Sequence, residues 1–293
     1  MLPPFEIHQP TTLDEAAALR ARLGETAALY AGGSELILAM KEGLGDFAHL
    51  IDVKTIPALH QLELASDGTT LVVGAAVTHR ALERAPLVRE RFPLLAEAER
   101  QVGNVRVRAM GTLGGNLCFA EPHSDPPTAL LVHDATVILH GREGARRMAL
   151  AEFLVGPYET SLRADEIMAR IEVPAAPPGS AGAYLKFGMH ERPTVGVAVI
   201  LVPDEKAAAV AEARVSVGCV GPAATRLPAL EDQLTGVRLN LLEPGWAPAE
   251  RAGAALDAVS DLHGSADYKR AMAGVFVKRA LALAARRTRP LAA

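Results

Sequence analysis

Cysteine is nearly absent from this sequence: only Cys118 and Cys219 occur among its 293 residues. An iron–sulfur cluster needs about four cysteine or histidine ligands, and a structural zinc site needs closely spaced ligand pairs. Two cysteines that lie far apart in the sequence meet neither requirement. We therefore expect no metal site in this chain, so any metal chemistry has to come from another chain.

Two further absences concern membranes and nucleic acids. No apolar run is long enough to span a bilayer, and residues 1–6 lack the basic start and apolar core of a secretory signal. The formal net charge is −4, which gives no electrostatic reason to bind nucleic acid. The sequence therefore predicts a cytoplasmic protein with no transmembrane segment and no nucleic acid partner.

The common nucleotide-binding fingerprints are also missing. The dinucleotide fingerprint requires G-x-G-x-x-G between a strand and a helix, and the phosphate loop of nucleotide hydrolases ends in Gly-Lys-Ser/Thr. Neither spacing occurs in the glycine-rich parts of this chain. A nucleotide ligand would have to be held by a different architecture.

Two short glycine-rich segments are present instead. The first glycine segment is Ala31-Gly32-Gly33-Ser34-Glu35-Leu36, and the second is Gly111-Thr112-Leu113-Gly114-Gly115-Asn116-Leu117. Adjacent glycines let the backbone turn sharply and expose successive amides, which form a concavity suited to phosphate oxygens. Gly-Gly is also a common turn signal, so either segment alone is weak evidence. The pair favours a diphosphate held from both sides.

The remaining pattern predicts an α+β protein that is long enough for two domains. A capping box at Thr12–Glu15 starts a helix that stops at Gly24, and Asp125 followed by two prolines starts another. Pro174–Ser180 is the clearest linker. Strands are expected over 27–31, 49–53, 59–64, 70–74, 136–140, 147–150, 167–173, 184–187, 195–202 and 211–217. Further helices are expected over 78–85, 93–101, 247–259 and 265–285.

Taken together and in this order, the motifs resemble the FAD-binding medium subunit of the molybdenum hydroxylases. This family includes carbon monoxide dehydrogenase and xanthine dehydrogenase. Both glycine segments resemble its flavin motifs, and the similarity continues through His123-Ser124-Asp125-Pro126 and Tyr184-Leu185-Lys186-Phe187. It extends over Val217–Arg226 and Asp261–Lys269, so essentially the whole chain is covered.

The resemblance implies a fold and a domain order. It implies a two-lobed FAD-binding domain of the vanillyl-alcohol-oxidase/PCMH type, followed by an α+β C-terminal domain with an antiparallel sheet and helices. We expect lobe 1 over residues 1–57, lobe 2 over 58–176 and the C-terminal domain over 177–293.

The resemblance also implies which residues bind FAD. Asp125 would accept a hydrogen bond from a ribitol or ribose hydroxyl, although it also suits a helix N-cap. Lys186 would lie near the pyrimidine end of the flavin, or else be an exposed strand lysine. Ile167 and Met168 would line the cofactor pocket, or be plain core. The complete implied set is Ala31, Gly32, Gly33, Ser34, Glu35, Leu36, Gly111, Thr112, Gly114, Gly115, Asn116, Asp125, Ile167, Met168 and Lys186.

No residue is assigned a catalytic role. His123 and His190 are isolated histidines, which are more often structural than catalytic. Relatives often carry an aromatic residue after the flavin lysine, where this chain has Glu191-Arg192-Pro193-Thr194. The sequence therefore leaves open whether an aromatic ring stacks on the flavin.

The implied function is electron transfer within a larger complex. A large molybdenum subunit would oxidise the substrate, a small iron–sulfur subunit would relay electrons, and FAD on this chain would pass them to an external acceptor. The family implies a dimer of heterotrimers. Two alternatives stay open: a self-sufficient FAD-dependent reductase of the same fold, and a nucleotide-binding module that is not an enzyme.

Overall fold

The structure is a computed structural model that describes residues 2–188, 192–206, 208–242 and 246–288. His190 and Glu191 lie outside the described residues. The chain forms two compact units. Unit 1 comprises Met1–Leu82, Asn104–Ala120 and Ala135–Pro174, and unit 2 comprises Glu83–Gly103, Glu121–Asp134 and Ala175–Ala293. The expected three-part division of the chain remains a prediction.

Unit 1 begins with a small parallel sheet in the order β1-β3-β2. Its strands are β1 (Glu6–His8), β2 (Ala27–Tyr30) and β3 (His49–Asp52). Helix α1 (Leu13–Leu23) starts at the predicted cap, where Thr12 accepts a hydrogen bond from the Glu15 amide, and ends at Gly24. Helix α2 (Leu36–Lys41) begins at the last residue of the first glycine segment. The helix expected between the Thr12 cap and Gly24 and the strands expected over 27–31 and 49–53 are therefore present.

A second, antiparallel sheet completes unit 1, in the order β4-β5-β10-β6-β7. Its strands are β4 (Leu62–Leu64), β5 (Thr70–Gly74), β6 (Thr136–Gly141), β7 (Gly144–Ala149) and β10 (Ile167–Pro174). The remaining elements here are α3 (His79–Arg84, which ends in unit 2), α6 (Val105–Met110), α7 (Leu113–Phe119), α9 (Leu150–Phe153), β8 (Leu154–Gly156) and β9 (Glu159–Thr160).

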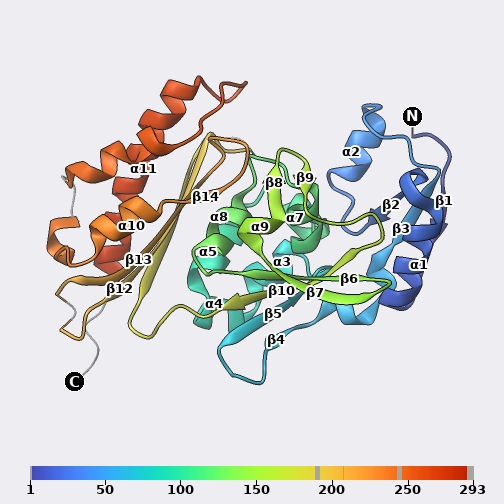
Figure 1. Cartoon of the computed structure of the whole chain (residues 1–293), viewed down its shortest axis with the longest axis horizontal. Helices are drawn as coiled ribbons and strands as arrows, with labels where there is room; N and C mark the ends of the chain where they lie inside the picture. The colour runs from blue at the N-terminus through green and yellow to red at the C-terminus, as the bar shows by residue number, and fades with distance from the viewer. Residues whose placement is uncertain (1, 189–191, 207, 243–245, 289–293) are drawn as a thin grey trace. The chain divides into compact units, whose positions relative to one another are not determined.

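Unit 2 is built on a four-stranded antiparallel sheet that is covered on both faces (Figure 1). Its strands are β11 (Ala181–Phe187), β12 (Val195–Pro203), β13 (Val210–Gly218) and β14 (Thr225–Arg226). Alternate residues of β12 face opposite cores: Ala198 and Ile200 pack with Leu94 of α5, whereas Val197 and Val199 pack with residues of α11. The helices are α4 (Pro86–Arg91), α5 (Pro93–Gln101), α8 (Asp125–Leu131), α10 (Pro228–Leu234) and α11 (Ala266–Arg287).

Four local expectations were wrong. The strand expected over 59–64 begins only at Leu62, because Pro57–His60 form a 3-10 helix. The helix expected over 247–259 is a 3-10 helix over Ala247–Ala255, whose Gly253 packs against the backbone of Arg270 in α11. The second glycine segment is not a turn throughout, because α7 begins at Leu113. The N-cap of α8 is Ser124, so Asp125 does not cap that helix.

Within the described residues, no helix combines the length and the apolar character needed to cross a bilayer.

Candidate functional site

The two glycine segments meet within unit 1. A Cβ atom on Gly32 would lie 2.3 Å from the carbonyl oxygen of Met110 and 2.7 Å from the Cα of Gly111. Both distances are far below van der Waals contact, so only glycine at position 32 lets the two backbones come this close. The two segments therefore lie side by side in the structure.

The first glycine segment exposes consecutive amides. No hydrogen bond within the described part of the chain uses the amides of Gly32, Gly33 or Ser34. Gly33 has a φ of 72°, a left-handed conformation that favours glycine, and its carbonyl oxygen accepts from the Ile37 amide at 3.0 Å. Leu36 packs against the small core of Ala28, Met40 and Leu50. The segment is thus fixed at its C-terminal end and leaves three donors for an anion.

The glycine amides of the second glycine segment are already used within the protein. Leu113 donates to the Val77 carbonyl at 3.0 Å, and Gly114 donates to the Ala75 carbonyl at 3.1 Å. Gly115 donates to the Thr112 hydroxyl at 3.1 Å, which is the N-cap of α7. This differs from the expectation of free amides on both sides. The physical reason is that the first turn of α7 docks on the chain that follows β5.

The glycines of this segment serve packing. A Cβ on Gly114 would lie 2.5 Å from the Ala75 Cβ and 2.7 Å from its Cα, so glycine allows α7 to approach that backbone. A Cβ on Gly115 would instead meet the Thr112 hydroxyl at 2.8 Å, with the Ala31 Cβ 3.9 Å away. Position 115 therefore faces the first glycine segment.

A pocket of about 320 Å³ borders the second glycine segment in unit 1. Met110 and Thr112 form part of its wall. Lys54 supplies a cationic group that is held by Asp52 at 2.6 Å and lies 3.6 Å from the centre of the Tyr30 ring. The full lining is Lys54, His60, Leu62, Ala76, Val77, Thr78, Ala81, Ala109, Met110 and Thr112.

Ile167 and Met168 lie on β10 and are buried in unit 1. Neither residue lines the pocket described above. Their role in cofactor binding stays a prediction.

In unit 2, Asp125 and Lys186 form a buried ion pair. The Asp125 carboxylate is 3% exposed and accepts from the Tyr184 hydroxyl at 2.5 Å and from the Lys186 ammonium at 3.1 Å. Lys186 also donates to the Gln101 carbonyl at 2.6 Å, and its side chain is only 13% exposed. Lys186 is therefore not an exposed strand lysine.

Burial dominates the electrostatics of this pair. Desolvation raises the pKa of Asp125 to about 6, although Lys186 and the Tyr184 hydrogen bond act in the opposite direction. Burial and the neighbouring carboxylate raise the pKa of Tyr184 well above its usual value. The hydroxyl thus stays protonated and can act as a donor.

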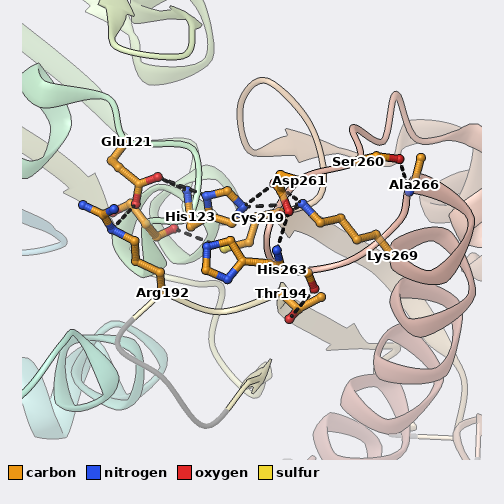
Figure 2. Close-up of polar contacts among 11 residues, drawn as sticks. Glu121, His123, Arg192, Thr194, Cys219, Ser260, Asp261, His263, Ala266 and Lys269 are labelled. Carbon is orange, nitrogen blue, oxygen red and sulfur yellow. Dashed lines mark hydrogen bonds and ion pairs between the residues drawn. The ribbon is translucent and has the colours of Figure 1, made fainter.

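A second charged cluster in unit 2 surrounds His123 (Figure 2). Its imidazole contacts the carboxylates of Glu121 and Asp261, each at 3.0 Å. Lys269, which is 1% exposed, donates to Asp261 at 2.5 Å, and Arg192 pairs with Glu121 at 3.3 Å. The cluster accounts for the Asp261–Lys269 motif, because it ties the turn before α11 to that helix.

The sequence did not reveal that Lys269 is buried beside Asp261. Burial alone would raise the pKa of Asp261, but the Lys269 ammonium and the His263 amide hold it below its usual value. Ser265 caps α11 by accepting from the Tyr268 amide at 3.2 Å.

The fold defines a class of protein: a two-unit α+β protein whose first glycine segment leaves three consecutive backbone amides unused. Residues 3–176 match the family described as the FAD binding domain in molybdopterin dehydrogenase. Residues 189–284 match the CO dehydrogenase flavoprotein C-terminal domain. The chain therefore belongs to the FAD-binding subunits of the molybdopterin dehydrogenases, and the resemblance, fold class and FAD cofactor predicted from the sequence are confirmed.

Individual relatives span nearly the whole chain. The carbon monoxide dehydrogenase medium chain of Hydrogenophaga pseudoflava is 37% identical over 284 residues, covering 96% of this chain and 97% of the relative. The nicotine 6-hydroxylase medium subunit of Paenarthrobacter nicotinovorans is 30% identical, with 98% and 99% covered. A solved structure of the Hydrogenophaga pseudoflava carbon monoxide dehydrogenase that lacks the Mo-pyranopterin moiety of its cofactor matches with a TM-score of 0.91 at 35% identity, covering 99% of this chain and 100% of that one.

Proposed function

We propose that this chain is the electron-transfer subunit of a molybdenum-containing hydroxylase or dehydrogenase. It would receive electrons from iron–sulfur clusters of a partner subunit and deliver them, through its FAD, to an external acceptor. The observation that carries this proposal is the set of three free amides at Gly32, Gly33 and Ser34, in a chain whose family is named for FAD binding. The enzyme is thus an oxidoreductase of which this chain is one part, and this part alone would not oxidise the substrate.

The first glycine segment would bind the diphosphate. Consecutive amides supply partial positive charge without a cation, and the Ser34 hydroxyl adds one more donor. Ala31, Glu35 and Leu36 would set the shape of this turn. Bound FAD would supply the redox chemistry, and this segment would hold it in place.

The second glycine segment would form the wall of the diphosphate site opposite the first glycine segment. Gly111 would let the backbones of the two segments approach, since its Cα would lie 2.7 Å from a Cβ on Gly32. Gly115 would leave room beside the Thr112 hydroxyl and the Ala31 side chain. Thr112, Gly114 and Asn116 would fix the start of α7. The neighbouring pocket, which has an ammonium at one side and alanine, valine and methionine elsewhere, suits one ring system of the cofactor.

In unit 2, Asp125 and Lys186 are the residues we propose for contact with the cofactor. A carboxylate has about four acceptor sites, and Tyr184 and Lys186 occupy only two of those on Asp125. It could therefore also accept from a ribitol or ribose hydroxyl. The Lys186 ammonium would favour reduced flavin. Ile167 and Met168 complete the proposed set as apolar residues near the cofactor.

The partners we propose are a large molybdenum-binding subunit and a small iron–sulfur subunit, arranged as a dimer of heterotrimers. The relatives' names support the large and small partners, because they denote medium chains or medium subunits. We also propose a cytoplasmic location, since both cysteines are free thiols, as is usual in a reducing compartment.

The test is to purify the complex from its own host and determine its composition by native mass spectrometry. We expect one FAD for each copy of this chain, together with a molybdenum subunit and an iron–sulfur subunit. Under anaerobic conditions, the substrate should reduce the flavin of the complex but not the flavin of this chain alone. A stable species that contains only this chain and turns over its own substrate would instead indicate a self-sufficient reductase.

A further inference from the structure

We propose that Glu6, His8 and His49 form a binding site for a divalent transition-metal ion on the small parallel sheet of unit 1. This site is independent of the FAD site. His8 and His49 are 41 residues apart in the sequence, so no local motif indicates it. The strand pairing brings the three side chains together.

The register of the sheet explains how they meet. In the parallel pair of β1 and β3, Glu6 lies opposite His49, and His8 lies opposite Ile51. Side chains two residues apart on a strand point to the same face, so Glu6 and His8 share a face. Directly opposed residues also share a face, which adds His49. Two imidazoles and one carboxylate therefore project from the same side of the sheet.

The distances are close to those of a metal site. The Nε2 of His8 and the Nδ1 of His49 are 3.1 Å apart, and a carboxylate oxygen of Glu6 lies 3.6 Å from the same His49 nitrogen. One ligand atom from each residue lies within 4.8 Å of the other two. Zinc bonds of about 2.0–2.1 Å in tetrahedral geometry separate the ligand atoms by about 3.3 Å. The two imidazole nitrogens are hydrogen-bonded to each other in the structure, so an ion would replace that hydrogen bond once the rings turn their lone pairs toward it.

The three side chains differ in exposure and therefore in how freely they can move. The side chains of His8 and His49 are 16% and 26% exposed, so the sheet holds them in place. Glu6 is 66% exposed and can rotate to close the remaining distance. The open side leaves a position for water. The site is thus partly preformed and accessible to an ion from solution.

The donor set selects the class of ion. Imidazole nitrogens favour zinc, copper, nickel and cobalt over magnesium or calcium, which prefer oxygen ligands. Because β1 is an edge strand of only three residues, an ion that bridges it to β3 would hold the edge of the sheet. We infer a structural role, since binding to the folded state stabilises that state.

The experiment is a calorimetric titration of the full chain with Zn²⁺ after removal of metal with a chelator. We expect one ion for each chain, and His8→Ala and His49→Ala should each weaken binding by about tenfold or more. His140→Ala is the matched control, because His140 is a partly buried histidine of unit 1 that also pairs with a carboxylate, Asp14, at 2.7 Å. This control should bind zinc like the wild type.

Zinc should also raise the melting temperature of the wild type and of His140→Ala, but not that of His8→Ala. If the histidine variants fail to fold, Glu6→Gln remains informative, since its exposed side chain can change without disturbing the core. Glu6→Gln should bind zinc more weakly than the wild type. The proposal is overturned if the wild type does not bind zinc, if both histidine variants bind it like the wild type, or if binding disappears only in Cys118→Ser.

Discussion

Replacing Asp125 by asparagine should change how the stability of the protein depends on pH. The Asp125 carboxyl is buried in unit 2 between the Tyr184 hydroxyl and the Lys186 ammonium. Burial raises its pKa from 3.8 to about 6, which outweighs both favourable partners. Asparagine keeps a similar shape but has no titrating proton.

The sign and size of the effect follow from linkage. Because the folded-state pKa lies above the unfolded value, the folded protein binds this proton more tightly than the unfolded chain does. The resulting stabilisation is complete below about pH 3.8 and is lost as the pH rises through about 6. A tenfold difference in proton affinity corresponds to about 1.4 kcal/mol. Because the pKa rises from 3.8 to about 6, the whole effect is about 3 kcal/mol. About 2 kcal/mol of it falls between pH 4.5 and 7.5.

The measurement is urea unfolding of the wild type and Asp125→Asn at intervals over that pH range. The free energy of unfolding of the wild type, minus that of the variant, should fall as the pH rises. Asp204→Asn is a control from the same unit, because amide hydrogen bonds from Ala208 and Ala209 lower the pKa of Asp204. The free energy of unfolding of the wild type, minus that of Asp204→Asn, should not fall as the pH rises. A flat or rising difference for Asp125→Asn would mean that the Lys186 ion pair, and not burial, controls this carboxyl.

Three other substitutions test separate parts of the structure. Gly115→Ala should fold but bind FAD at least about tenfold more weakly by flavin fluorescence, because the added methyl would lie 2.8 Å from the Thr112 hydroxyl and 3.9 Å from the Ala31 Cβ of the first segment. Gly156→Ala, where a Cβ meets nothing within 4 Å, should bind FAD normally. Lys186→Met should lower the midpoint potential of bound flavin in a redox titration, and an unchanged or higher potential would place the ammonium away from the ring. Gly253→Ala should lower the free energy of unfolding in urea by about 3 kcal/mol, since the added Cβ would lie 1.9 Å from the Arg270 carbonyl oxygen. A variant as stable as the wild type would contradict the close packing of position 253 against α11.

Most of the fold could be predicted from the sequence because its signals are local. The strands of the unit 2 sheet alternate apolar residues that face two cores, and α1 carries its own cap at Thr12 and its own stop at Gly24. The start of α7 could not be predicted in this way. Two glycines in a first helical turn are unfavourable by propensity, and here the helix depends on hydrogen bonds to Val77 and Ala75.

The candidate site was partly predictable for the same reason. The first glycine segment exposes its amides through its own backbone conformation, including the positive φ of Gly33, and adjacent glycines in the sequence indicate that property. The ion pair of Asp125 with Lys186 joins residues 61 positions apart, and its burial depends on how α8 and β11 pack. No local pattern could show that this lysine is buried.

Glycine has three different physical roles in the two segments, and each role predicts a different result of substitution. Gly33 supplies a left-handed conformation, so a side chain there strains the turn that holds the free amides. Gly32 lets two backbones touch, so a side chain there separates the segments. Gly114 lets α7 pack on Ala75, so a side chain there acts on stability before it acts on binding. Because Gly32, Gly33 and Ser34 keep their amides free whereas the glycine amides of the second segment are used, we expect the first segment to contribute electrostatically to the proposed diphosphate site and the second to contribute shape.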